Sequence, residues 1–172
     1  MTSQQLIISG VGGQGILFIT RLLAETAIAK GLPVLTSETH GMAQRGGIVI
    51  SHLKIGDFAS PLIRPGQADG LIALSTSNVA LHRSFLRTDG WIAANSAQPL
   101  CLAEPPQVIT IDADQIARNM DNPQAVNLIV LGKALASSRL FCTVDEMMAV
   151  ISRHLSGRPA QLAGALAAVT AA

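Results

Sequence analysis

Short apolar runs and longer segments of helical periodicity alternate along the first part of the chain. Residues 5–9 contain the apolar run Leu6 to Ile8 and predict a short buried strand, and a cluster of glycines follows it. In residues 15–30 the side chains of Ile16, Ile19 and Leu23 fall on one face, as in an amphipathic helix. Residues 33–38 are the next strand candidate. The pattern therefore predicts a βαβ unit over residues 5–38, with its two strands as parallel neighbours.

The remaining pattern predicts further strands and a helical C-terminal third. The pattern of the tail from Ala160 allows either a helix or a frayed end. Thr143 and Glu146 have the spacing of a capping box at the start of the helix before it. The strand at 47–56 alternates so that Ile48, Ile50, His52 and Lys54 share one face, and we expect one face to be more exposed than the other. The predicted strands are 47–56, 70–75, 90–96 and 107–112, and the predicted helices are 77–87, 113–120, 123–137 and 143–155.

No linker or internal repeat interrupts this alternation. The pattern predicts a single domain over residues 1–172, of the α/β class, with a Rossmann-like three-layer fold in which helices cover both faces of a mostly parallel sheet. Hydrophobic residues make up 49% of the chain and charged residues 13%, which suits one large core.

Composition and charge exclude several classes of function. The net charge is +1 and aromatic residues make up 3%, so no basic field or stacking platform for nucleic acid is expected. No apolar stretch approaches the roughly 20 residues of a spanning helix, and the N-terminus is not that of a signal peptide, so a cytoplasmic protein without a membrane segment is expected. Cys101 and Cys142 are expected to be buried reduced thiols. Two thiolates cannot hold an iron–sulfur cubane, which needs about four.

Gly10, Gly12 and Gly15 have the G-x-G-x-x-G spacing, between a predicted strand and a predicted helix. In that context Gly10 would allow a tight turn, and Gly12 would let a ligand or another backbone segment come close. Gly15 would let the helix pack on the strand. The helix N-terminus would then be free to hold an anion. A dinucleotide would also need an acidic residue to hold its ribose, and Glu38 is the candidate. A glycine turn that only closes the βα unit is the structural alternative.

A second glycine-rich loop, residues 39–47, follows Glu38 and is unusual for a plain nicotinamide domain. If the first two strands are neighbours, both loops meet at one rim of the sheet. Arg45 would there offer a guanidinium fork to a phosphate or carboxylate, beside Gly46 and Gly47, which admit close approach. A solvated loop charge is the other interpretation of Arg45.

No sequence pattern points to catalysis or metal binding by this chain. The four histidines lack metal-ligand spacing, and the serines at strand ends lack a G-x-S-x-G motif. The apolar positions of residues 123–137 are expected to form core or subunit interface. We also expect a partner to cover an apolar patch, for which the C-terminal helices offer faces.

The segments "GVGGQGILFITRLLAETAIAKG", "ETHGMAQRGGIVISHLKIG" and "NLIVLGKALA" resemble the gamma-type component of 2-oxoacid:acceptor (ferredoxin) oxidoreductases. The stretch "HGMAQRGG" is most similar to the beta subunit of indolepyruvate oxidoreductases. The resemblance covers residues 5–155, and its specific motifs fall on residues 10–15 and 41–47. It implies a Rossmann-like domain without its own redox centre, and it argues against a bound dinucleotide.

The resemblance also implies cofactors and partners. Thiamine diphosphate and [4Fe-4S] clusters are expected in a catalytic partner subunit, and coenzyme A is a candidate ligand of the glycine-rich rim. The isolated chain is a candidate homodimer. Two alternatives stay open: a free-standing Rossmann oxidoreductase that binds NAD or a flavin, and a purely structural interaction domain. The residues expected to line the rim, for coenzyme A, another anion or a partner, are Gly10, Gly12, Gly13, Gln14, Gly15, Glu38, His40, Gln44, Arg45, Gly46 and Gly47.

Overall fold

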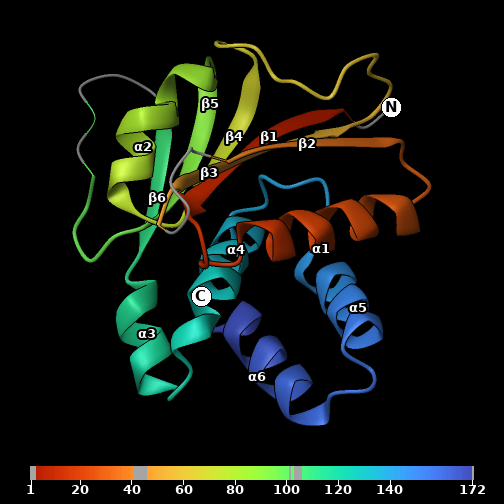
Figure 1. Ribbon diagram of the computed structural model, residues 1–172, viewed down its shortest axis with the longest axis vertical. Coiled ribbons are helices and arrows are strands. Elements are labelled where there is room, and N and C mark those ends of the chain that lie inside the picture. Colours follow the sequence, from red (N-terminus) through yellow and green to blue (C-terminus); the bar gives the residue numbers. More distant parts are fainter. Residues whose placement is uncertain (1–2, 41–45, 101, 103–105, 172) are drawn as a thin grey trace.

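The computed structural model describes residues 3–40, 46–100, 102 and 106–171. Its centre is a six-stranded sheet with the strand order β2-β3-β1-β4-β5-β6 (Figure 1). The strands are β1 (Gln4–Val11), β2 (Val34–His40), β3 (Ile48–Ile55), β4 (Ala68–Ala73), β5 (Leu86–Asn95) and β6 (Gln107–Ile111). The helices are α1 (Ile16–Ala29), α2 (Thr76–His82), α3 (Ala113–Asn119), α4 (Val126–Ala136), α5 (Val144–His154) and α6 (Pro159–Thr170), and 3-10 turns cover Arg83–Phe85 and Pro123–Ala125.

The sheet is parallel from β1 to β6 and antiparallel around β3. β1, β4, β5 and β6 pair in parallel, whereas β3 pairs antiparallel with both β1 and β2. The prediction that the first two strands are parallel neighbours is therefore wrong. β3 forms a hairpin with β2 and then pairs with β1, so the open edge of β1 is filled by a strand that follows β2 in the sequence.

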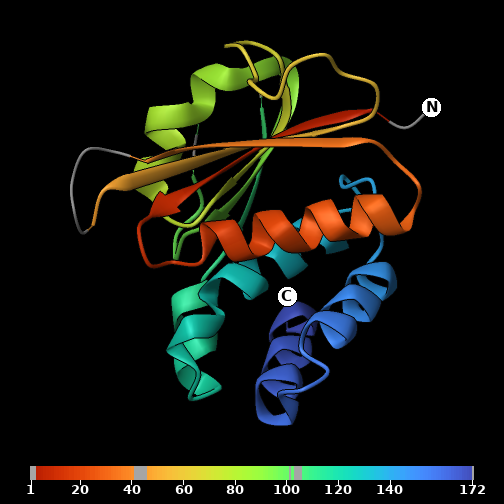
Figure 2. The same cartoon turned by 45° about the vertical axis from the view of Figure 1, so that its right-hand side comes forward.

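Both faces of the sheet are covered, which confirms the three-layer prediction (Figure 2). Along β1 the side chains of Leu6 and Ile8 enter the core beneath α1, α4, α5 and α6, while Ile7 enters a smaller core beneath α2. All three side chains have no exposed surface. A strand that is buried on both faces has consecutive apolar residues, as Leu6, Ile7 and Ile8 are in residues 5–9.

The prediction that β3 has one more exposed face is wrong. His52 is 5% exposed and Lys54 is 9% exposed. The segment that follows β3 covers this face, because the Ile63 N–H donates to His52 Nδ1 over 3.2 Å and Lys54 Nζ lies 5.0 Å from the centroid of the Phe58 ring. Ring and hydrogen-bond contacts thus compensate for burying polar side chains that the alternation placed on an outer face.

The C-terminal third is helical, and its tail forms α6 rather than a frayed end. Ala165, Ala168 and Val169 of this helix are buried in the larger core. The capping box of Thr143 and Glu146 is present at the start of α5. α4, α5 and α6 bury their apolar faces against each other and α1, and none of the exposed large hydrophobic side chains of the described residues lies on these three helices. They are Leu17, Ile28, Ile48, Leu62 and Leu81.

Cys142 is a buried free thiol, and burial raises its pKa to about 12. It therefore stays protonated at neutral pH. Cys101 lies outside the described residues. In the part of the chain that is described, no helix combines the length and apolarity needed to span a bilayer.

Gly132 sets the approach of α4 to α6, since a Cβ on it would lie 2.1 Å from the carbonyl oxygen of Val169. Gly132→Ala should separate the two helices and lower the free energy of unfolding by roughly 1–3 kcal/mol, despite the higher helix propensity of alanine. Gly157→Ala is the matched control, because a Cβ there meets no atom within 4 Å, and it should change stability by no more than about 0.5 kcal/mol. Urea unfolding curves of both variants test the contact, and equal midpoints would contradict it.

Candidate functional site

The first glycine-rich loop joins β1 to α1. Gly13 and Gly15 have φ values of 98° and 78°, which favour glycine, and a Cβ on Gly15 would lie 2.1 Å from Asn127 Nδ2. The Val11 N–H donates to Gln14 Oε1 over 2.7 Å and so closes the turn. Gly15 therefore packs against the start of α4 rather than against its own strand, which corrects its predicted role.

The second glycine-rich loop contacts the first one. The Gly12 N–H donates to the carbonyl oxygen of Gly47 over 2.8 Å, and a Cβ on Gly12 would lie 3.5 Å from that oxygen. Gly46, with a φ of 72°, precedes it in the turn into β3. The predicted meeting of the two loops is thus confirmed for these glycines. It arises through β3, and not through adjacency of β1 and β2.

The other predicted rim residues are not all brought to this contact. Glu38 lies on β2 opposite Ser51, which in turn lies opposite Ile8 on β1. Two strand spacings, about 10 Å, therefore separate it from β1. In a dinucleotide-binding Rossmann fold the acidic residue ends the strand next to β1. β3 occupies that place here, so Glu38 does not lie where a dinucleotide-binding Rossmann fold has its ribose ligand. His40 ends β2, and Gln44 and Arg45 lie outside the described residues.

A polar cluster at the junction of β1 and β4 was missed by sequence reasoning. The Asn78 side-chain amide donates to Ser9 Oγ over 3.1 Å, and this hydroxyl lies 2.9 Å from His82 Nδ1. Ser75 Oγ donates to Asn78 Oδ1 over 2.5 Å and lies 2.8 Å from Ser77 Oγ. Ser9 and Asn78 are buried. No sequence signal marked this cluster, because the pairing of β1 with β4 is a tertiary feature.

This junction is where the sheet changes its winding direction. The chain leaves β1 through α1 toward β2, and it leaves β4 through α2 toward β5 on the opposite side and the opposite face. Ligands of open α/β sheets bind in the crevice at such a point, outside the carboxyl ends of the strands. The first glycine-rich loop and the Ser75–Asn78 turn border this crevice. The geometry therefore favours a ligand or partner at the carboxyl ends of β1 and β4.

A groove of about 710 Å³ lies on the other side of the first glycine-rich loop, and sequence reasoning did not predict it. The start of α1, the turn before α4, the end of α5 and the start of α6 line it. His154 and Arg158 are its basic residues, and Asp114 is its acidic one. No motif marked the groove, because segments that lie far apart in the sequence form it. Its lining includes Gly13, Gln14, Gly15, Phe18, Gln124, Asn127, His154, Arg158 and Gln161.

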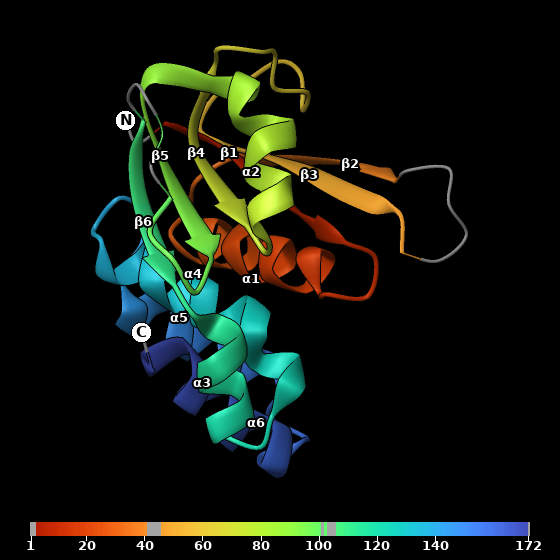
Figure 3. The ribbon, with the colours of Figure 1, turned by 90° about the vertical axis from the view of Figure 1, so that its left-hand side faces the viewer.

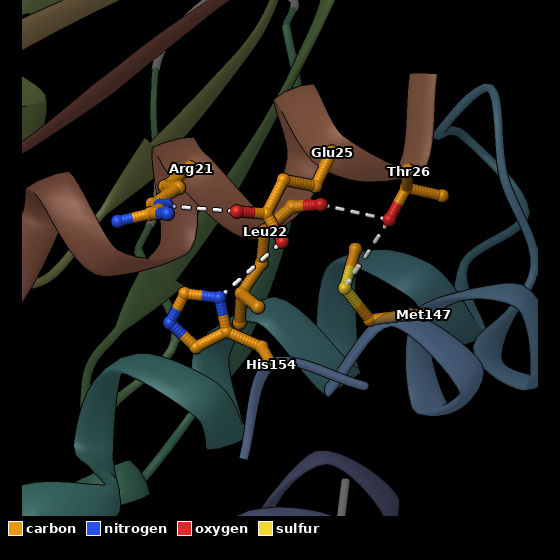
Figure 4. A network of polar contacts seen from close by, with 6 residues as sticks. All are labelled: Arg21, Leu22, Glu25, Thr26, Met147 and His154. Carbon is orange, nitrogen blue, oxygen red and sulfur yellow. Dashed lines mark hydrogen bonds and ion pairs between the residues drawn. The ribbon is translucent and has the colours of Figure 1, made fainter. Parts of the chain in front are cut away.

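A polar network behind the groove holds α5 against α1 (Figure 4). His154 Nδ1 lies 3.3 Å from Glu25 Oε2, and its ring meets that of Phe18 edge-on at 5.7 Å. Burial raises the pKa of Glu25, but its hydrogen bonds with Arg21 and His154 lower this pKa by more, so the carboxylate is ionised at neutral pH. The ring of His154 is thereby oriented at the edge of the groove.

Comparison with known proteins identifies the family. Over residues 5–172 the chain matches the family described as pyruvate ferredoxin/flavodoxin oxidoreductase. The chain belongs to this family. It is 35% identical over 147 residues to the indolepyruvate oxidoreductase subunit IorB of Archaeoglobus fulgidus, an alignment that covers 74% of this chain and 73% of the relative. The resemblance stated from the sequence is thereby confirmed.

Two solved structures share the fold. The gamma subunit of a keto/oxoacid ferredoxin oxidoreductase from Geobacter sulfurreducens aligns over 96% of this chain and 94% of its own, with 22% identity and a TM-score of 0.75. A 2-oxoglutarate:ferredoxin oxidoreductase from Magnetococcus marinus, solved with 2-oxoglutarate, coenzyme A and succinyl-CoA bound, has a TM-score of 0.75 and 16% identity. That alignment covers 100% of this chain but 32% of the other, so this chain spans about a third of its length.

Among the described residues of this family member, no group of three or more His, Cys, Asp or Glu side chains could hold a metal ion. The groups that the described part of the chain presents at the carboxyl edge of the sheet include backbone N–H groups, serine hydroxyls and amides. These are donors that recognise phosphate and carboxylate oxygens.

His52 and His82 should make the fold sensitive to acid. Burial lowers the pKa of both, and the nearby His82 and Lys54 lower that of His52 further, whereas a hydrogen bond with the Asn78 backbone partly opposes the shift at His82. As the pH falls below 6.5, the ordinary pKa of a histidine side chain, these two histidines therefore bind protons in the unfolded chain before they do so in the folded protein. The contribution of these two histidines to the free energy of unfolding should therefore be constant above pH 6.5 and should decrease as the pH falls below 6.5.

Urea midpoints measured at about pH 7.5 and about pH 5.5 test this pH dependence. In His52→Gln the amide oxygen can still accept the Ile63 N–H but binds no proton, so the acid-induced loss should be smaller than in the wild type. Equal losses in the wild type and the variant would show that His52 does not contribute.

Proposed function

We propose that this chain is the subunit without a redox centre of a 2-oxoacid:ferredoxin oxidoreductase that acts on indolepyruvate or another aryl pyruvate. The single observation that carries the proposal is the family match over residues 5–172, with indolepyruvate oxidoreductase subunits among the relatives. The reaction converts a 2-oxoacid, coenzyme A and an oxidised acceptor into an acyl-CoA, carbon dioxide and the reduced acceptor. Two electrons pass to the acceptor for each 2-oxoacid consumed.

The redox chemistry belongs, in this proposal, to a catalytic partner subunit that carries thiamine diphosphate and [4Fe-4S] clusters. The chain has two cysteines, and a cubane needs about four thiolates. The buried Cys142 thiol, with its raised pKa, is also a poor ligand for iron. The chain would act as one domain over residues 1–172 and complete the assembly.

The glycine-rich rim is the part of this chain that we propose to hold coenzyme A or an equivalent anion. A Cβ on Gly13 would meet no atom within 4 Å, and Gly12 and Gly13 are exposed, so a phosphate can approach the backbone there. The first residues of α1 add N–H groups and the positive end of the helix dipole. Arg45 would add a charged fork from the second loop. Coenzyme A, when bound, supplies the thiol that accepts the acyl group.

The alternative of a free-standing NAD- or flavin-dependent enzyme is less well supported. Its acidic ribose ligand would have to come from the strand next to β1, and that strand is β3, which runs antiparallel. The family match is the second argument against it.

Activity is expected to need the partner. The isolated chain should not oxidise indolepyruvate with an artificial acceptor, whereas the chain co-expressed with a thiamine-dependent subunit from its host should do so in the presence of coenzyme A. Turnover by the chain alone would contradict the subunit proposal. Turnover of only a different 2-oxoacid by the reconstituted complex would keep the family and correct the substrate.

Arg45→Ala tests the rim. The variant should fold as the wild type does, because surface-loop changes usually cost within about 0.5 kcal/mol. The complex should lose roughly 1.5–3 kcal/mol in coenzyme A affinity or in assembly, the range for hydrogen bonds to charged groups. Arg45→Lys should restore only part of the loss. Arg64→Ala, which removes another exposed arginine outside the helices and strands, is the control. An unchanged Michaelis constant for coenzyme A together with unchanged assembly would remove Arg45 from the site.

A further inference from the structure

The groove that includes His154 and Arg158 has the size and the position of a separate small-molecule site. Its volume of about 710 Å³ lies within the range of roughly 300–1,000 Å³ that such sites have. Figure 3 shows that the helices bordering it, α1, α3, α4 and α6, lie on one side of the sheet, whereas α2 lies on the other. The groove therefore lies on the opposite side of the sheet from the α2 helix that follows the Ser75–Asn78 turn.

His154 is held so that one of its ring nitrogens stays available to a ligand. Its Nδ1 lies 3.3 Å from Glu25 Oε2, and this nitrogen carries a proton because the ionised carboxylate can only accept. Figure 4 shows the second nitrogen, Nε2, on the part of the ring that points away from Glu25. Within the described part of the chain no hydrogen bond engages Nε2. A proton on Nε2 can therefore be donated to an anion in the groove.

Arg158 adds a second basic group to the same groove. Its side chain is exposed and, among the described residues, has neither an ion pair nor a hydrogen bond. The acidic residue of the lining, Asp114, already accepts a hydrogen bond from the Asn95 side-chain amide over 2.9 Å. A guanidinium presents a planar fork of donors to phosphate or carboxylate oxygens. The groove is thus suited to an organic anion.

The charge of the two basic groups favours a phosphate over a carboxylate. A phosphate monoester carries about −1.5 to −2 charges at pH 7, whereas a carboxylate carries one. Arg158 together with a doubly protonated His154 supplies two positive charges. A phosphate monoester therefore matches these two side chains more closely.

The rest of the lining is suited to a flat heterocycle. The half-buried Phe18 ring meets the His154 ring edge-on at 5.7 Å, and Val126 adds an apolar wall. The side-chain amides of Gln124 and Gln161 also line the groove, and no hydrogen bond within the described residues engages them. Each amide offers both donors and an acceptor, which is what the polar edge of a nucleobase requires.

We propose that this groove binds a mononucleotide, with its phosphate at Arg158 and His154 and its base beside Phe18. The combination of two basic groups, an aromatic ring and free amides in one groove of this size favours a small molecule over an acidic segment of a partner subunit. The site goes beyond the proposed function and does not rest on it, because it needs neither the partner subunit nor the redox reaction. It is a binding site, with no chemical step.

Calorimetric titration of the full chain tests the site, with AMP as the probe. The wild type should bind one AMP per chain. Adenosine and inorganic phosphate, which each carry one half of the chemistry of AMP, should bind at least about 10-fold more weakly, because each lacks one set of contacts.

Arg158→Ala should raise the dissociation constant of AMP about 10- to 150-fold, through the loss of hydrogen bonds to a charged group. Arg153→Ala is the matched control, because Arg153 is also exposed and lies in the last turn of α5 but does not line the groove. It should change the constant by no more than about 2-fold.

A second pair of variants tests the position of the site by filling it. Gln161→Trp places a large side chain at the groove and should abolish AMP binding. Ala163→Trp places the same side chain on an exposed position of α6 outside the lining, and should bind AMP as the wild type does. Circular dichroism checks that all four variants fold.

Four outcomes would overturn the proposal. AMP binding that is absent, or no tighter than that of inorganic phosphate, would show an adventitious anion only. Equal effects of the two arginine variants, or of the two tryptophan variants, would place any binding elsewhere. Displacement of AMP by coenzyme A, with Arg158→Ala weakening both, would make the groove part of a coenzyme A site. Weakened assembly of Arg158→Ala with the catalytic subunit, without any effect on AMP, would assign the groove to that subunit.

Discussion

The structure depends on the complete burial of β1. This strand is paired on both sides, with β3 and β4, and its side chains fill both cores of the molecule. Leu6, Ile7 and Ile8 have no exposed surface. Hydrophobic burial on this scale holds the carboxyl end of β1 in one place. Because the first glycine-rich loop begins there, the position of that loop is set by the core and needs no ligand.

Three close backbone contacts then arrange the edge of the sheet around this loop. Gly12 touches Gly47, Gly15 touches Asn127, and Gly132 lets α4 approach α6. Each contact joins segments that are far apart in the sequence. The contacts at Gly15 and Gly132 would be lost if a side chain larger than hydrogen stood there, because a Cβ would lie 2.1 Å from the facing atom in each case. These two glycines therefore act by letting other segments approach.

The division of labour proposed for the complex follows from what this chain can provide. It has a sheet edge with backbone N–H and hydroxyl donors, and a buried apolar core, but a thiol set too small for a cluster. A domain of this kind can position a carrier such as coenzyme A and can dock other subunits. In the proposed complex, electron transfer occurs on a partner subunit, which is consistent with the relatives being named as subunits of oxidoreductases.

The sequence by itself determined the elements, the three-layer class, the glycine motifs and the family. These features rest on local periodicity, on turn residues and on short motifs, all of which are written within a few residues of one another. The boundaries of α1 and α5, to within one residue, and the capping box at Thr143 follow in this way, whereas β1 continues two residues beyond the predicted end, to Val11. Only the tertiary structure decided the place of β3 between β1 and β2, the burial of His52 and Lys54, the cluster at Ser9, and the groove beside Arg158. Each of these depends on contacts between distant segments, and such contacts are selected by the packing of the whole core, which no local pattern encodes.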